Sequence, residues 1–229
     1  MSSGASTLST SGPIFIRTAE GGSLGASGSM YFTTGDAESG DSGSIVMETG
    51  SSAEGGSGGS ISMCVGTGAS GDGGNLELVA GDSKATDGVG GKLSLFGGNS
   101  IHTNGGNGGG ILFQGGLSLA SESPDSEGGN VSLAGGTALS GSGGSVLVSS
   151  GAGLDSSSGK ITLSTTNAGE AGVSGDILFC TGSSSCGDSG AIHLKTGEGN
   201  GGPGGNISLA VGESNSGMGG CLTLQAGDS

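Results

Sequence analysis

An alternation of apolar and polar residues recurs along almost the whole chain. The repeated phrase is Gly-x-Φ-x-Φ, where Φ is apolar, as in Gly59-Ser60-Ile61-Ser62-Met63. We call the two Φ residues of one repeat its anchor pair. Alternation with a period of two is typical of a half-buried β-strand. The fourteen anchor pairs are Ile14/Ile16, Met30/Phe32, Ile45/Met47, Ile61/Met63, Leu76/Leu78, Leu93/Leu95, Ile111/Phe113, Val131/Leu133, Val146/Val148, Ile161/Leu163, Ile177/Phe179, Ile192/Leu194, Ile207/Leu209 and Leu222/Leu224.

Glycine follows the same period. Successive anchor pairs lie 15 to 20 residues apart, most of them 15 or 16. The residue two positions before each first anchor residue is Gly in every repeat, and the residue five positions after it is Gly except at Ala19 and Thr166. Because glycine adopts positive φ without a Cβ clash, we expect these glycines to turn the chain at both ends of each strand.

One strand with two apolar residues cannot bury them alone, so the repeats are expected to stack on one another. The sequence therefore predicts an all-β fold, a parallel β-solenoid (β-helix) rod of about 14 coils with a 15–16-residue repeat. Residues 1–11 form a lead-in, and residues 12–229 form a single repeat domain. A third glycine, ten residues after the first anchor residue, marks a predicted corner in Gly40, Gly55, Gly71, Gly141, Gly187, Gly202 and Gly217.

Composition opposes this prediction. The 229 residues include 59 Gly, and the formal net charge is −15, values typical of a chain too poor in apolar surface to fold. Only the strict period argues for order. Five Lys and Arg residues exclude a phosphate-binding surface, so no nucleic acid partner is expected. No apolar run approaches 18 residues, so no membrane span is expected either.

Several residues that alternate with the anchor pairs are also apolar. They point to the opposite side of the strand, and a sheet that is apolar on both faces is usually covered on both. We expect this side to pack against another copy or another layer of the chain, although isolated exposed apolar residues are also common. The candidate lateral-packing face consists of Phe15, Tyr31, Val46, Val79, Phe96, Leu112, Leu147 and Leu178.

Residues able to carry chemistry are few and scattered. His102 and His193 lie in different repeats, and the Lys and Arg residues are dispersed, so we predict neither catalytic nor metal-binding residues and no cofactor. Asp residues such as Asp41 and Asp72 precede some strands, as in Gly/Asp-rich calcium nonapeptides. Those repeats have nine residues and an Asp in each, unlike these, so no calcium site is predicted. Because the residues able to carry chemistry are scattered, the chain is not expected to be an enzyme either.

The four cysteines allow two interpretations. Cys180 and Cys186 lie within one repeat and could close a short disulfide loop, whereas Cys64 and Cys221 are about ten repeats apart. The spacing matches no zinc pattern. A disulfide in an extracellular setting and small buried thiols both remain open.

The phrases GGNVSLAGG, GGSVLVSSG, GGNISLAVG and SGDILFCTG resemble Gly/Ser-rich repeats of predicted surface proteins from diatoms and other marine algae, and of some virus-encoded proteins. The resemblance covers residues 12–229 and implies a fibrous role at a cell or virion surface or outside the cell. It predicts a self-associating structural protein that forms a filament or coat.

The alternative is a binding rod that presents a flat Ser/Thr/Asp face to ice, mineral or glycan. Insect ice-binding solenoids carry a regular outward Thr-x-Thr array. Here the threonines occur one per repeat on the anchor side, at Thr18, Thr34, Thr49, Thr165, Thr181 and Thr196.

Overall fold

A computed structural model describes residues 2–6, 10–53, 55–102, 104–120, 126–170 and 172–227. Within these ranges the chain contains neither α-helix nor β-strand. It runs as irregular backbone interrupted by turns and bends. The predicted all-β parallel β-solenoid is therefore wrong. The alternating segments are present in the sequence, but they do not pair into a sheet.

Two observations account for this difference. In the described ranges, the only backbone hydrogen bonds between two repeats join the glycines at the ends of successive anchor segments, and none joins the anchor residues themselves, although such bonds are what hold stacked coils together. No residue of the same ranges is buried, so there is no core to hold the repeats in place. Two apolar side chains per repeat do not offset the entropy of ordering about 15 residues.

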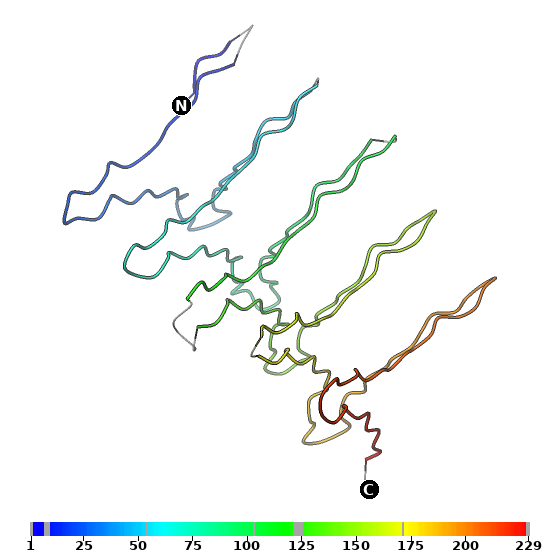
Figure 1. The fold of residues 1–229 in the computed structure, drawn as a ribbon. Coiled ribbons are helices and arrows are strands. Elements are labelled where there is room, and N and C mark those ends of the chain that lie inside the picture. Colours follow the sequence, from blue (N-terminus) through cyan, green and yellow to red (C-terminus); the bar gives the residue numbers. More distant parts are fainter. Residues whose placement is uncertain are drawn as a thin grey trace. The chain divides into compact units, whose positions relative to one another are not determined.

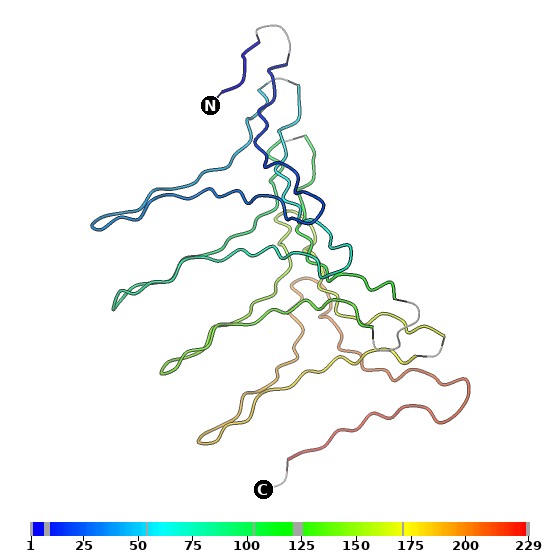
Figure 2. The same ribbon diagram turned by 90° about the vertical axis from the view of Figure 1, so that its left-hand side faces the viewer.

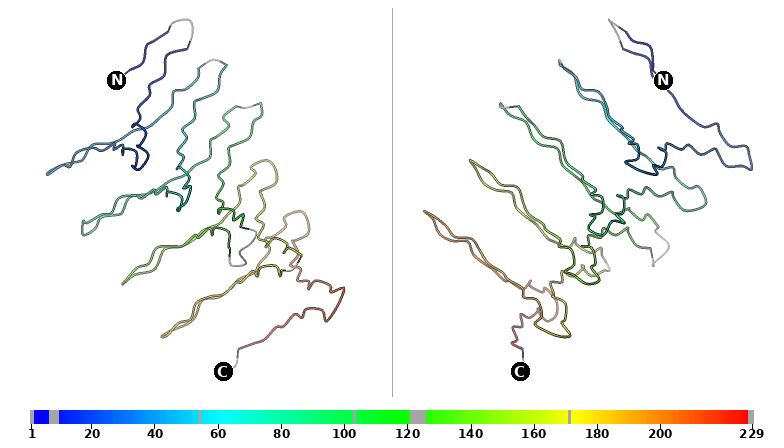
Figure 3. Two further views of the ribbon diagram at one scale, coloured as in Figure 1. Left: turned by 60° about the vertical axis from the view of Figure 1, so that its left-hand side comes forward. Right: turned by 180° about the vertical axis from the view of Figure 1, so that it is seen from behind.

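The chain divides into two units, Met1–Leu112 and Phe113–Ser229. The division falls inside the anchor pair Ile111/Phe113, so the same repeat continues through both units. In each unit the chain runs outward and returns, over and over, as narrow two-limbed loops (Figures 1, 2 and 3). The predicted lead-in of residues 1–11 and the start of the repeats at residue 12 stay predictions.

Each narrow loop connects the anchor segment of one repeat to that of the next. We call the place where its two limbs meet the neck. At one kind of neck, main-chain atoms close the loop: the amide of Gly109 donates to the carbonyl oxygen of Gly98 at 2.8 Å. The same bond, at 2.8 to 2.9 Å, joins Gly91 to Gly81, Gly129 to Gly116, Gly144 to Gly136 and Gly159 to Gly151.

At a second kind of neck, a threonine side chain lies between the limbs. The hydroxyl of Thr34 donates to the carbonyl oxygen of Gly43 at 3.2 Å, and that of Thr49 donates to Gly59 at 3.1 Å. The two kinds of neck differ in the residue four positions after the first anchor residue, which is Thr34 or Thr49 at the second kind. Where it is small, the limbs reach main-chain bonding distance; such residues are Ala80, Gly97, Gly115, Gly135 and Ser150.

The glycines at the ends of the anchor segments do not have the role that the sequence predicted. None of them has a positive φ. Only the glycines that precede the anchor pairs are close to the other limb: a Cβ on Gly59 would lie 3.0 Å from the Cβ of Thr49, and one on Gly129 would lie 2.8 Å from the nitrogen of Gly116. A larger residue at these positions would push the neck open. A Cβ on the glycines that follow the anchor pairs, such as Gly50 and Gly116, would meet nothing within 4 Å.

Positive φ occurs instead within the loops. Four of the predicted corner glycines have it, namely Gly40, Gly55, Gly187 and Gly217, with φ between 69° and 126°. An L-residue rarely adopts this conformation. These glycines therefore reverse the chain inside a loop and do not form the corners of a coil.

Candidate self-association surface

The anchor segments have two sides that differ in exposure. In every repeat the first anchor residue is about half exposed, from 42% for Met30 to 58% for Leu222. The apolar residues that alternate with the anchor pairs are 76% to 88% exposed. Neighbours in an extended segment point to opposite sides. We call the side formed by the anchor pairs the anchor face and the opposite side the alternate face.

Neither face is covered by any part of the chain that the structure describes. The accessible surface is 22507 Å², whereas a folded protein of 21.1 kDa exposes roughly 9,000 Å² by the usual size scaling. The chain thus exposes more than twice the surface of a folded monomer. The exposed residues include the large apolar side chains of both faces, and extensive exposed apolar surface marks interaction sites.

Charge is absent from the anchor face. No Asp, Glu, Lys or Arg occupies an anchor position, and the residue four positions after the first anchor residue is always Thr, Val, Ala, Ser or Gly. The acidic residues that give the net charge of −15 lie in the loops or on the alternate face, as Glu77 does. Covering the anchor face would therefore bury no charged group.

The predicted lateral-packing residues are all on the alternate face and strongly exposed. They are Phe15, Tyr31, Val46, Val79, Phe96, Leu112, Leu147 and Leu178. Similar positions in other repeats hold polar residues, such as Glu77, Ser94 and His193. The apolar character of this face is therefore interrupted. Packing of these side chains against another copy stays a prediction.

All four cysteines are free and exposed, including Cys180 and Cys186, so their disulfide also stays a prediction. Cys64 and Cys180 occupy the same place in their repeats, three positions after the first anchor residue. The alignment of the repeats places both thiols on the alternate face. The Cys64 sulfur lies 3.4 Å from the Ser62 hydroxyl oxygen.

The groups that could support metal binding or catalysis do not converge. In the part of the chain that the structure describes, no three His, Cys, Asp or Glu side chains are close enough to hold a metal ion. The Nδ1 atom of His102 accepts a hydrogen bond from the amide of Asn104 at 3.2 Å, which places this imidazole in a local turn. His193 is exposed on the alternate face.

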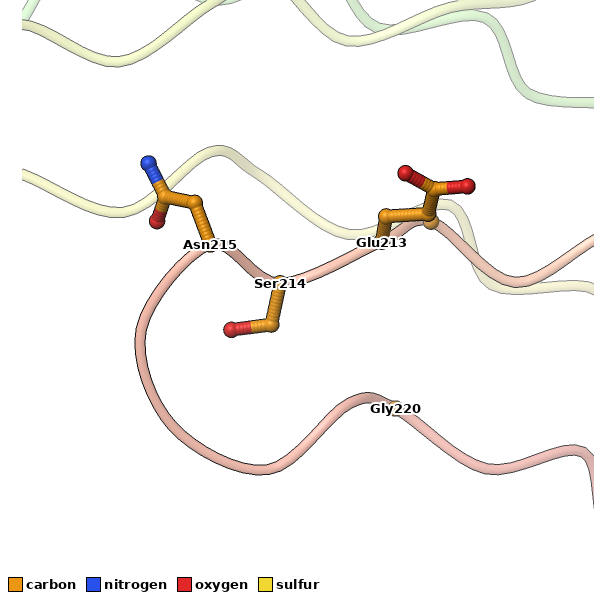
Figure 4. Close-up of a pocket in the computed structure, with 5 residues that line it drawn as sticks. Glu213, Ser214, Asn215 and Gly220 are labelled. Carbon is orange, nitrogen blue, oxygen red and sulfur yellow. The ribbon is translucent and has the colours of Figure 1, made fainter.

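Two open hollows occur in the loops. One is lined by Arg17, Thr18, Ala19 and Glu20. The other lies beside Glu213, Ser214, Asn215 and Gly220; Ser214 points into the bend of the chain, whereas Glu213 and Asn215 point away from it (Figure 4). The Ser214 hydroxyl donates to the carbonyl oxygen of Ser216 at 3.2 Å. Because these polar groups diverge, the second hollow lacks the convergent donors and acceptors of a ligand site.

The chain matches no family model, no curated protein and no solved structure. Among the described residues, no helix has the length and apolarity needed to cross a membrane.

Proposed function

We propose that this chain is a structural protein whose copies associate into an extracellular filament or surface coat. One observation carries the proposal: an uncharged apolar pair recurs fourteen times, yet no described residue is buried. Water disfavours exposed aliphatic surface at about 25 cal/mol per Å². A chain that repeats such surface without covering it gains stability when another molecule covers it.

The main chain supports the same proposal. Outside the necks and tight turns, the anchor segments have no main-chain hydrogen bonds to one another in the described ranges. In a single copy these donors and acceptors bond only to water, and an extended segment with free amide and carbonyl groups is a template for pairing with another chain. Association of copies would satisfy both the apolar side chains and the backbone groups.

The location outside the cell rests on the resemblance of the repeats to surface proteins of algae and viruses. The excess of acidic residues over basic ones, 20 against 5, fits a protein that must stay dispersed until it assembles, because a net charge of −15 opposes premature association. Self-association also needs no catalytic residue, in agreement with the scattered polar side chains.

Electron microscopy and analytical ultracentrifugation of the purified chain test the proposal. We expect filaments or extended layers, and a sedimentation coefficient that rises with protein concentration. Dispersed single chains at all concentrations would overturn it. Dispersed chains that bind ice, mineral or an array of glycans would support the binding rod instead.

A further inference from the structure

We infer that copies of this chain associate through the anchor face, with the anchor pairs of one copy covered by those of a second copy. The inference rests on the proposed function, because it names the surface and the partner of that association. It differs from the lateral-packing prediction, which placed the contact on the alternate face.

The amount of surface argues for a long partner. The accessible surface of 22507 Å² exceeds that expected for a folded protein of this mass by roughly 13,000 Å². A standard interface covers only about 800 Å² per partner. A small globular partner would therefore leave most anchor pairs exposed, whereas another chain of equal length could cover all of them.

The spacing argues for a partner with the same repeat. Anchor pairs recur mostly every 15 or 16 residues, but intervals of 17, 18 and 20 residues occur between Leu76 and Val131. A second copy has the same irregular intervals in the same order. Its anchor pairs can therefore meet these anchor pairs throughout, which a surface of uniform period cannot do.

Charge and uniformity distinguish the anchor face from the alternate face. Every anchor position holds Ile, Leu, Val, Met or Phe, whereas the alternate face includes Glu77, Lys92 and His193. The first anchor residues are also consistently less exposed than the apolar residues of the alternate face. The anchor face is thus apolar in every repeat, whereas the alternate face, with its charged residues, can remain in water.

Substitutions within one tripeptide provide the test. The double variant Val146→Ser/Val148→Ser removes one anchor pair, and Leu147→Ser removes the apolar residue between them, which is 88% exposed. We expect the double variant to raise the dissociation constant for self-association at least roughly tenfold, and Leu147→Ser to change it less than about twofold. Sedimentation equilibrium measures both.

The same comparison in another repeat uses Ile177→Ser/Phe179→Ser and Leu178→Ser. A photo-reactive amino acid at position 148 should also give cross-links between copies, whereas the same group at position 147 should not. Circular dichroism of each variant shows whether its average backbone conformation has changed.

The outcomes separate the two proposals. A wild-type chain that stays dispersed overturns the proposed function and this inference together. A wild-type chain that assembles, but is weakened equally or more by Leu147→Ser than by the double variant, overturns only the inference. Assembly that neither substitution weakens has the same consequence, because the contacts then lie outside the anchor segments.

Discussion

The hydroxyl of Thr49 donates to the carbonyl oxygen of Gly59 at 3.1 Å, where other necks have a main-chain bond. A Cβ added to Gly59 would lie only 3.0 Å from the Cβ of Thr49, so a larger residue at position 59 would crowd this threonine. The way a loop closes therefore varies with the residue at this position. At Thr34 and Thr49 the γ-methyl group separates the limbs, and the hydroxyl supplies a hydrogen bond in place of the main-chain one.

Replacing Thr49 with Ala should convert its neck to the main-chain kind. Without the γ-methyl group, the Gly59 amide can reach the Gly50 carbonyl oxygen, as the Gly91 amide reaches Gly81 after Ala80. A main-chain bond worth about 0.5–1.5 kcal/mol should slow amide exchange at Gly59 by roughly 2- to 10-fold. Hydrogen exchange followed by NMR measures the change.

Thr49→Val is the matched control, because it keeps the bulk and removes the hydroxyl. Amide hydrogen exchange at Gly59 should then stay fast. The same fast exchange is expected at the necks that hold Val65 or Val211. Equal protection in the Ala and Val variants would show that side-chain size does not select the kind of neck.

Adjacent glycines should differ sharply in their tolerance of alanine. A Cβ on Gly115 would collide with the carbonyl oxygen of Gly129, whereas a Cβ on Gly116 meets nothing within 4 Å. Gly115→Ala should therefore break the bond from the Gly129 amide to Gly116 and raise its exchange rate severalfold. Gly116→Ala should leave it nearly unchanged.

The pairs Gly97/Gly98 and Gly135/Gly136 repeat this difference between neighbours, since the first member of each would also meet a carbonyl oxygen across the neck. Equal effects at both members of a pair would contradict the described neck geometry.

Self-association should strengthen with salt. A net charge of −15 makes copies repel one another, and raising NaCl from about 20 mM to about 500 mM shortens the Debye length from about 20 Å to about 4 Å. Because the anchor face itself is uncharged, screening removes repulsion without weakening the contact. Sedimentation at several salt concentrations should show larger species at high salt. Dissociation by salt would instead indicate ion pairs at the interface.

Lowering the pH should act in the same direction. Protonation of carboxylates reduces the net negative charge as the pH falls from 7 toward the sequence pI of about 4.1. Light scattering should therefore increase on acidification and fall again when neutral pH is restored. Assembly that weakens on acidification would show that ionised carboxylates take part in the contact.

The four cysteines should all be reactive in the dispersed chain. Each is free and exposed, so a thiol reagent should modify four groups per chain before any denaturant is added. Mass spectrometry after alkylation under non-reducing conditions counts them. A species that carries two alkyl groups instead of four, with Cys180 and Cys186 unmodified and two hydrogens fewer than the dithiol, would reveal their disulfide. The variant Cys186→Ser should abolish that species.

The sequence predicted several features that depend only on neighbouring residues. The alternation of residues along each segment correctly gave two sides, as the exposures of Val146 and Leu147 illustrate. Four of the predicted turning glycines, including Gly40 and Gly187, have positive φ. The prediction that glycines end each segment by adopting positive φ was wrong. The other limb leaves little room for a Cβ at glycines such as Gly59 and Gly129, whereas Gly50 and Gly116 have open space.

By itself the sequence determined the period, the anchor pairs and the absence of charge at the anchor positions, since these are properties of consecutive residues. Only the tertiary structure decided that the segments do not pair into a sheet, and that Thr49 and Ala80 close their loops differently. Pairing depends on the path of each loop and on the distance between its limbs. A repeat pattern specifies neither, because segments with free backbone groups can bond to the same chain, to another copy or to water.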